Sequence, residues 1–148
     1  MHPTAERVKQ RLSERGLEID VVTLTDSART AGEAAAAVGS EVGQIVKSLV
    51  FVRDQMPVMV LCAGDRRVDN KRLGLAPANA DQARAATGFA IGGIPPLGHD
   101  NDLETVVDAS LRRFETVWCA AGTPHCVFEV DTEALIAALD RATVLEVA

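Results

Sequence analysis

Two valine-rich runs close together in the chain limit its fold more than any other feature. Residues 45–52 and 57–62 are mostly apolar and β-branched, and the polar residues Arg53, Asp54 and Gln55 lie between them. Short runs of this kind on both sides of a polar turn are typical of adjacent strands. The sequence therefore predicts a strand–turn–strand unit, and the fold has to contain a β-sheet.

Helical and strand patterns on both sides of this unit predict a mixed architecture. Apolar spacing and capping residues predict helices over residues 4–15, 30–38, 80–87 and 132–141, with shorter helical segments at 69–75 and 111–114. Strands are expected at residues 19–24, 105–108, 116–121 and 126–130, with an edge strand at 143–147. Because short turns join several later strands, we expect an α/β fold with a mixed, curled β-sheet, partly barrel-like and surrounded by helices. No linker or repeat divides the chain, so residues 1–148 are expected to form a single domain.

The composition fits a folded protein and excludes several functional classes. Hydrophobic residues make up 47% of the 148 residues and there is no tyrosine, so we expect a core of Val, Leu, Ile and Ala. No segment approaches the ~20 apolar residues of a membrane span, and the first residues lack the apolar region of a secretory signal. We therefore expect a cytoplasmic protein without membrane association. A net charge of −6 argues against general coating of nucleic acid but permits contact with one RNA end.

The cysteines and the absence of common motifs narrow the chemistry further. Cys62, Cys119 and Cys126 are odd in number, lack a CxxC spacing and lie in apolar runs, which favours a reducing compartment and packing over a nucleophilic role. Trp118 is expected in the core. The three histidines are far apart, and the motifs for dinucleotides, P-loop nucleotides, a nucleophilic serine and zinc are absent. The sequence predicts no metal and no cofactor.

Lys47 is the first of four features that suggest a ligand. In an alternating strand it shares one face with Leu49 and Phe51, so its ammonium lies either at an edge or in a cleft. Its stem could cover apolar surface, or its charge could bind an anionic group such as a terminal phosphate. The strand pattern alone leaves both interpretations open.

The second feature is the glycine- and proline-rich segment at residues 92–98. Gly92 and Gly93 would allow a ligand to approach backbone N–H groups closely, and Pro95 and Pro96 would restrict the path of the chain. Such a loop could stabilise the oxyanion of a hydrolysing ester. It could equally be a rigid connection between elements.

The other two features are a turn histidine and a short basic segment. His125 follows residues 122–124 in a turn between strands, where it could bind a substrate or transfer a proton, or simply be exposed. Between Asp65 and residue 72, four cationic side chains could contact RNA phosphates or form a solvated face; they are Arg66, Arg67, Lys71 and Arg72.

Four motifs, taken in order, resemble one protein family. They are IVKSLVF at residues 45–51, AGD at 63–65, GFAIGGIPPLG at 88–98 and AGTPH at 121–125. Together they span nearly the whole chain and look like those of the YbaK/ProX family, also called the prolyl-tRNA synthetase-associated domain. The resemblance implies a trans-acting hydrolase that cleaves the ester between a wrong, small amino acid and the 3′-terminal adenosine of a tRNA. It implies tRNA as the partner and an aminoacyl-tRNA synthetase as a further candidate partner. The sequence leaves open whether the protein is a monomer or a homodimer.

The resemblance also implies roles for individual residues. Lys47 matches the signature lysine of the family, which holds the terminal phosphate and ribose, and Gly92 and Gly93 match the loop that presents N–H groups to the substrate carbonyl. Ser48 stands where alanine-specific members carry Asn, so the edited amino acid stays open. The residues expected to contact the substrate are Ser48, Asp65, Ile94, Pro95, Pro96 and His125.

The predicted chemistry needs no protein nucleophile. An aminoacyl ester is already activated, so orientation, an ordered water and electrostatic stabilisation suffice for its hydrolysis. One methylene changes binding by only ~1–3 kcal/mol, so we expect exclusion of larger amino acids to matter more than attraction of the wrong one. Two other functions fit the same residues: a module that binds a tRNA 3′ end or a nucleotide without hydrolysis, and an esterase or amidase that acts on a small metabolite.

Overall fold

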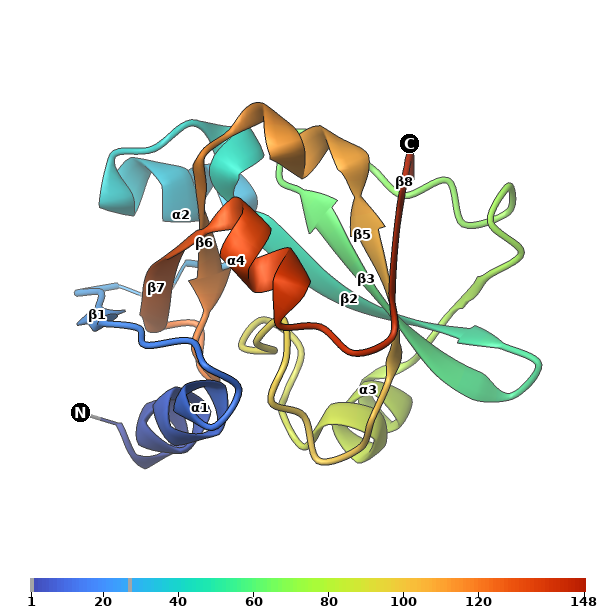
Figure 1. Cartoon of the computed structure of the whole chain (residues 1–148), viewed down its shortest axis with the longest axis horizontal. Coiled ribbons are helices and arrows are strands. Elements are labelled where there is room, and N and C mark those ends of the chain that lie inside the picture. Colours follow the sequence, from blue (N-terminus) through green and yellow to red (C-terminus); the bar gives the residue numbers. More distant parts are fainter. Residues whose placement is uncertain (1, 27) are drawn as a thin grey trace.

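The computed structural model describes residues 2–26 and 28–148, with helices on both sides of a set of strands (Figure 1). Among the described helices, none combines the length and the apolar character that crossing a bilayer requires. The elements are α1 (Pro3–Ser13), β1 (Val21–Thr23), α2 (Ala31–Val38), the 3₁₀ segment η1 (Val42–Gln44), β2 (Val46–Arg53), β3 (Met56–Ala63), β4 (Ala76–Pro77), α3 (Ala80–Thr87), β5 (Glu104–Asp108), the 3₁₀ segment η2 (Ala109–Arg113), β6 (Thr116–Ala120), β7 (Cys126–Asp131), α4 (Thr132–Ala137) and β8 (Ala142–Leu145).

The strands form two sheets. The order is β4-β2-β3-β5-β8 in the larger sheet and β1-β7-β6 in the smaller one. β2 pairs antiparallel with β3 and β4, whereas β5 pairs in parallel with β3 and β8, so the predicted mixed sheet is confirmed. The sheets meet at an isolated bridge between Ile45 and Trp118. The barrel-like part of the prediction is wrong, because β5 and β8 extend the larger sheet away from β2 and the described strands do not close on themselves.

The predicted strand–turn–strand unit is the antiparallel hairpin β2–β3. Its turn residues Asp54 and Gln55 have φ angles of 51° and 67°. Left-handed backbone at both central positions matches the twist of the flanking strands, which is why two-residue hairpins adopt it. The register pairs Arg53 with Met56 at the turn and continues along both strands to Val46 opposite Ala63. This hairpin therefore holds residues 47 and 48 in a regular strand.

Two local predictions fail and one strand was missed where tertiary contacts decide the path of the chain. Residues 70–74 form turns and not the predicted helix, and the Asp69 N–H donates to the carbonyl of Val147 instead. Helix α4 stops at Ala137, before the predicted end at residue 141, because the Arg141 carbonyl already accepts from the Thr105 N–H of the sheet. The two-residue strand β4 was not predicted at all.

The two faces of β2 belong to different parts of the core. Val46 and Val50 pack in the main cluster with the buried face of α1, and Leu49 and Phe51 pack in a second cluster with strands β3 and β5. This confirms that Lys47 shares the face of Leu49 and Phe51. Ser48 consequently lies on the opposite face.

Candidate functional site

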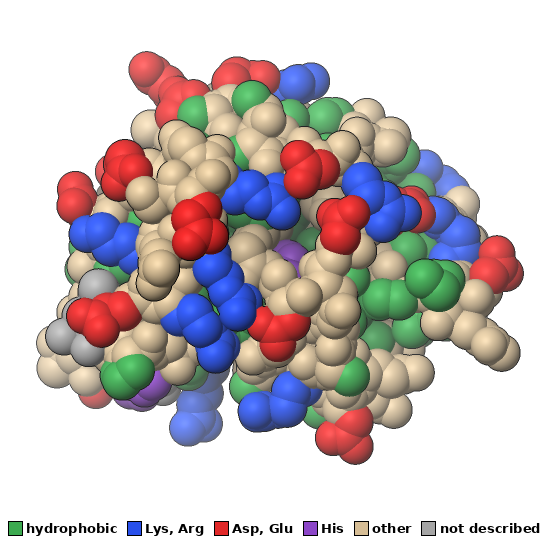
Figure 2. Space-filling model, turned by 60° about the horizontal axis from the view of Figure 1, so that its bottom comes forward, with side chains coloured by type: hydrophobic (Ala, Val, Ile, Leu, Met, Phe, Trp, Pro, Cys, Tyr) green, Lys and Arg blue, Asp and Glu red, His purple; other side chains and the backbone are tan. Residues whose placement is uncertain are grey.

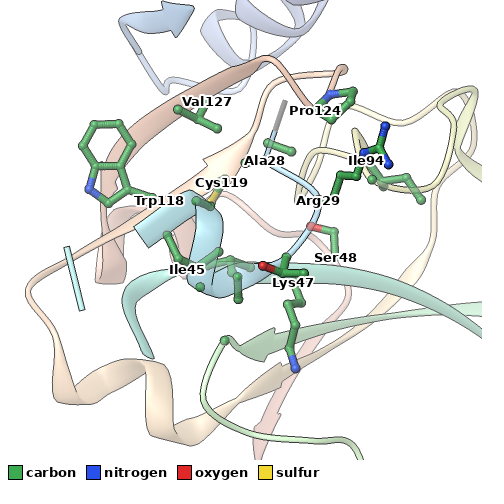
Figure 3. Close-up of a pocket in the computed structure, with 18 of the residues that line it drawn as sticks. Ala28, Arg29, Ile45, Lys47, Ser48, Ile94, Trp118, Cys119, Pro124 and Val127 are labelled. Carbon is green, nitrogen blue, oxygen red and sulfur yellow. The ribbon is translucent and has the colours of Figure 1, made fainter. Parts of the chain in front are cut away.

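A pocket of about 550 Å³ opens between α2, β2, β6 and two loops (Figure 3). The loops are residues 91–94 and the turn at residues 123–124. Its walls are mainly small and apolar, with Ala28, Ala34, Ile45, Trp118, Cys119, Pro124 and Val127 among the lining residues. A cavity of this volume and character is typical of a small-molecule site.

Lys47 and Ser48 both line this pocket but point in different directions. Figure 3 shows the Lys47 side chain running away from Cys119 and Pro124, whereas Ser48 points towards Arg29 and Ile94. The Lys47 ammonium donates to the backbone carbonyl of Arg66. An ammonium has three donors, so two stay available to an anion.

The Ser48 hydroxyl is the polar group on the pocket side of β2. Its oxygen is buried and has no hydrogen-bond partner among the described residues. A buried hydroxyl without a partner is costly in a folded protein. The hydroxyl is therefore available to a group of a bound ligand.

The two neighbouring glycines of the loop serve different purposes. Gly93 lies against the turn at residues 122–123, and a Cβ there would stand 2.6 Å from the carbonyl oxygen of Gly122. Its N–H donates to the Ala90 carbonyl at 3.0 Å, so Gly93 has no free donor for a substrate. Gly92 is exposed, has a φ of 96° and lines the pocket, and no hydrogen bond among the described residues uses its N–H.

The rest of the predicted loop lies behind the pocket. Ile94 lines the cavity, but Pro95 and Pro96 are buried and do not. The Nε2 of His99 lies 2.7 Å from the Pro95 carbonyl oxygen and is the donor, because that oxygen can only accept. Burial lowers the pKa of His99, and the hydrogen bond to Pro95 partly opposes this effect. His99 thus stabilises the loop as a neutral imidazole, through its hydrogen bond to Pro95.

The turn at residues 122–125 contributes its first part to the pocket and not its histidine. Thr123 and Pro124 line the cavity, whereas His125 is exposed and does not. The His125 carbonyl accepts from the Leu24 N–H at 2.7 Å, which ties the turn to the chain after β1. The structure therefore does not bring His125 together with Lys47 and Gly92.

The predicted basic segment divides into free and occupied side chains. Arg66, Arg67 and Lys71 are exposed, but Arg72 donates to the carbonyl oxygens of Glu146 at 2.7 Å and Ala148 at 3.1 Å. Arg72 therefore holds the C-terminal segment against the segment 66–72. Figure 2 shows basic and acidic side chains interspersed over one face of the molecule, so the cationic patches on that face are small.

Asp65, a predicted substrate contact, has a different partner. Arg113 donates to its two carboxylate oxygens at 2.8 and 2.7 Å. The hydrogen bonds from Arg113 hold the pKa of Asp65 below its usual value. The carboxylate does not line the pocket, although the preceding Gly64 does.

The arrangement suits binding and orientation more than covalent catalysis. Cys119 is a thiol that lines the pocket, but burial raises its pKa strongly, so it is not a nucleophile. Burial also raises the pKa of Cys62 to about 11, although Lys47 acts in the opposite direction. In residues 2–26 and 28–148 no group of three or more His, Cys, Asp or Glu side chains could hold a metal ion.

A match to a protein-family model shows to which family this chain belongs. A sequence model described as the aminoacyl-tRNA editing domain matches residues 25–138, which include every lining residue of the pocket. The chain belongs to the aminoacyl-tRNA editing domain family. The family resemblance of the four motifs is thereby confirmed.

Relatives of this editing domain occur both alone and inside a synthetase. The uncharacterized protein YwhH of Bacillus subtilis is 31% identical over 136 residues, which are 86% of each chain. A proline–tRNA ligase of Latilactobacillus sakei is 31% identical over 116 residues, which cover 74% of this chain but 20% of the ligase. A solved structure described as a proposed trans-editing enzyme for prolyl-tRNA synthetase is 42% identical, with a TM-score of 0.91 over 99% of this chain and 97% of that one.

Several pocket residues of the editing domain were not predicted from the sequence. Arg29 lines the pocket just before Thr30, the N-cap of α2, and Ile91 lines it as an apolar side chain that is 61% exposed. Trp118 was expected in the core, but it is half-buried and lines the pocket, because β6 is an edge strand that faces α2. The sequence places Arg29 beside the predicted start of a helix, but only the position of α2 brings that residue to the pocket.

Proposed function

We propose that the chain is a trans-acting aminoacyl-tRNA deacylase that hydrolyses the ester of tRNA mischarged with a small amino acid. The observation that carries this proposal is the pocket itself, whose apolar wall ends at the Gly92 N–H and at the cations Arg29 and Lys47. An aminoacyl ester at the 3′ end of tRNA has an apolar side chain, a carbonyl and a nearby phosphate. Each group has a matching part of the pocket.

In this proposal the residues bind and orient the ester while water attacks it. The Gly92 N–H donates to the carbonyl oxygen as negative charge develops there. Ser48 supplies its unpartnered hydroxyl to the ribose or the acyl group, and Lys47 binds the terminal phosphate with the N–H groups that Arg66 does not use. The free donor on Gly92 replaces the pair of glycine N–H groups expected from the sequence.

Selectivity in this proposal comes from the size of the acyl end of the pocket. Ile45, Trp118 and Val127 line the wall, and the Gly93–Gly122 contact keeps the loop close to it. Apolar contacts alone distinguish one methylene by only ~1–3 kcal/mol. Steric exclusion of larger amino acids by this wall therefore has to provide most of the selectivity.

Single-turnover deacylation of tRNAs charged with Ala, Cys, Ser, Thr and Pro tests the proposal. We expect fast release of a small amino acid, and a reduction of roughly 10- to 100-fold in Lys47→Ala, since a hydrogen bond to a charged group contributes about 1.5–3 kcal/mol. Lys9→Ala, on α1 and outside the pocket, is the matched control and should retain wild-type rates. A thermal melt of each variant separates lost chemistry from lost folding.

The same experiment distinguishes the alternative functions. If no amino acid is released above the spontaneous rate while the tRNA is still bound, the chain is a tRNA 3′-end binding module and not a hydrolase. The observation that favours this alternative is that the described residues lining the pocket include no histidine or carboxylate that could act as a general base. We propose tRNA as the partner, with a prolyl-tRNA synthetase as a second candidate, and a cytoplasmic site of action.

A further inference from the structure

The charges that line the pocket are all of one sign. Arg29 and Lys47 are its charged lining residues, and no Asp or Glu is among the described residues that line it. The first turn of α2 adds to this field, since Thr30, Ala31 and Gly32 line the pocket and the N-terminus of a helix carries partial positive charge. A positive group on a ligand would therefore find no carboxylate counter-ion among the described residues that line the pocket.

The carboxylates that directly follow the lining residues Gly32 and Gly64 are bonded to other groups. Glu33 accepts from the Thr30 hydroxyl at 3.2 Å on the exposed side of the α2 N-terminus. Asp65 accepts both of its hydrogen bonds from Arg113. Neither residue lines the pocket, so neither is placed to balance a positive charge on the acyl group.

An aminoacyl ester carries such a charge when its α-amino group is protonated. We propose that the pocket takes acyl groups with an uncharged α-substituent, so that 2-hydroxyacyl-tRNA is a substrate and an aminoacyl-tRNA reacts with its amine unprotonated. The inference rests on the proposed function. A hydroxyl or neutral amine can pair with the buried hydroxyl of Ser48, which both donates and accepts.

The reaction on such a substrate is an ordinary ester hydrolysis. Water adds to the carbonyl carbon, the bond from that carbon to the ribose oxygen breaks, and a proton passes to the ribose oxygen. The products are a 2-hydroxy acid and a tRNA with a free terminal hydroxyl. No oxidant, metal or additional reactant takes part.

Lactyl-tRNA and alanyl-tRNA test the inference, because they differ only in a hydroxyl in place of the α-amine. Nitrous acid converts the alanyl ester into the lactyl ester on the same tRNA. The measured quantity is the catalysed rate divided by the spontaneous rate of each ester, at pH 6 and pH 8. The charged or titratable residues that line the pocket, Arg29, Lys47 and Cys119, are the same for both esters, so the comparison isolates the α-substituent.

We expect lactyl-tRNA to exceed alanyl-tRNA by about tenfold or more at pH 6 and the gap to close at pH 8, since an α-amine loses its proton near pH 7.7–8.0. Hydrolysis of alanyl-tRNA with an equal or larger enhancement at pH 6 would overturn the inference and leave the deacylase function intact. Hydrolysis of neither ester above its spontaneous rate would overturn both.

A carboxylate introduced at the pocket edge provides a second test. In Thr30→Asp the new side chain still caps α2, because Asp is as good an N-cap as Thr, but it adds a negative charge beside the acyl group. We expect the lactyl-to-alanyl ratio at pH 6 to fall by about tenfold. Thr30→Asn is the matched control, which caps the helix without charge and should keep the wild-type ratio. An unchanged ratio in a stable Thr30→Asp variant would contradict the inference.

Discussion

The two rims of the pocket are built in opposite ways. The loop rim, residues 92–94, packs backbone against backbone on the turn at residues 122–124 and is braced from behind by His99. The cationic rim consists of the lining residues Arg29 and Lys47 together with the exposed Arg66, Arg67 and Lys71, whose segment is joined to the Lys47 ammonium through the Arg66 carbonyl.

This difference between the two rims indicates which substitutions should change folding and which should change substrate binding. Close-packed backbone has no room for an added atom, so a small change on the loop rim has to move the chain. Long charged side chains in solvent can be removed without moving anything, and their contribution should depend on salt instead. Substitutions on the loop rim should therefore affect folding and activity together, and substitutions on the cationic rim should affect substrate binding alone.

The largest effect is expected for Gly93→Ala. The Cβ of the new alanine would lie 2.6 Å from the Gly122 carbonyl oxygen and 2.7 Å from the Thr123 Cα. Both are backbone atoms, so they cannot move away by a change of side-chain rotamer. Overpacking of this kind costs about 1–3 kcal/mol, and we expect deacylation to fall at least 100-fold because Gly92 is displaced with its neighbour. Denaturant unfolding and single-turnover rates measure the two effects.

Gly32→Ala is the matched control for this substitution. Gly32 lines the same pocket, but the atom nearest to an added Cβ is the Thr30 hydroxyl oxygen at 3.9 Å, so there is room. Alanine also favours a helix over glycine by up to about 1 kcal/mol. Equal stability and activity in the two alanine variants would show that the loop rim is not packed tightly.

A smaller effect is expected when two charges of the cationic rim are removed. Arg67→Ala with Lys71→Ala should raise KM for aminoacyl-tRNA severalfold and reduce its salt dependence, since each phosphate contact contributes roughly 0.7–0.9 to the logarithmic slope. Unfolding should be unchanged, because both side chains are exposed. Lys9→Ala with Arg84→Ala removes the same charge from α1 and α3, outside the cationic rim, and is the control. An unaltered salt slope would favour a small-metabolite esterase, which needs no RNA contact.

The smallest effect is expected in the pH dependence of stability. Burial lowers the pKa of His99 in the folded protein below its unfolded value near 6.5. The stability that neutral His99 contributes to the folded protein is therefore complete above about pH 6.5. It is lost as the pH falls through the pKa of His99 in the folded protein. Thermal melts at pH 7.5 and pH 5 should show a smaller loss of stability in His99→Gln than in the wild type. His125→Gln, at an exposed histidine, should follow the wild type, and identical losses in all three proteins would contradict the assignment.

Local patterns were sufficient to predict much of the framework. The apolar runs around Asp54 and Gln55 predicted the central hairpin, and the caps Thr30 and Asn79 marked helices that begin one residue later. Hairpins and capped helices depend on residues a few positions apart, which is why the sequence alone reveals them. The helix predicted at residues 69–75 is a series of turns, and the Asp69 N–H at its start donates to the carbonyl of Val147, more than 70 positions away.

The candidate site was predicted in its motifs and only partly in its geometry. Lys47, Ser48, Gly92 and Ile94 do line one pocket. The sequence could not reveal that Arg72 holds the C-terminal segment or that Asp65 binds Arg113, because both partners are distant along the chain. It also could not show that Arg29 joins the pocket through the placement of α2.

By itself the sequence determined the strand that carries residues 47 and 48, the loop that has to contain glycine, and the editing family to which they belong. The tertiary structure decided which glycine keeps a free N–H and which packs on Gly122, and that Ser48 and not His125 faces the cavity. Strand alternation puts neighbouring side chains on opposite faces. Only the packing of distant elements determines what each face meets.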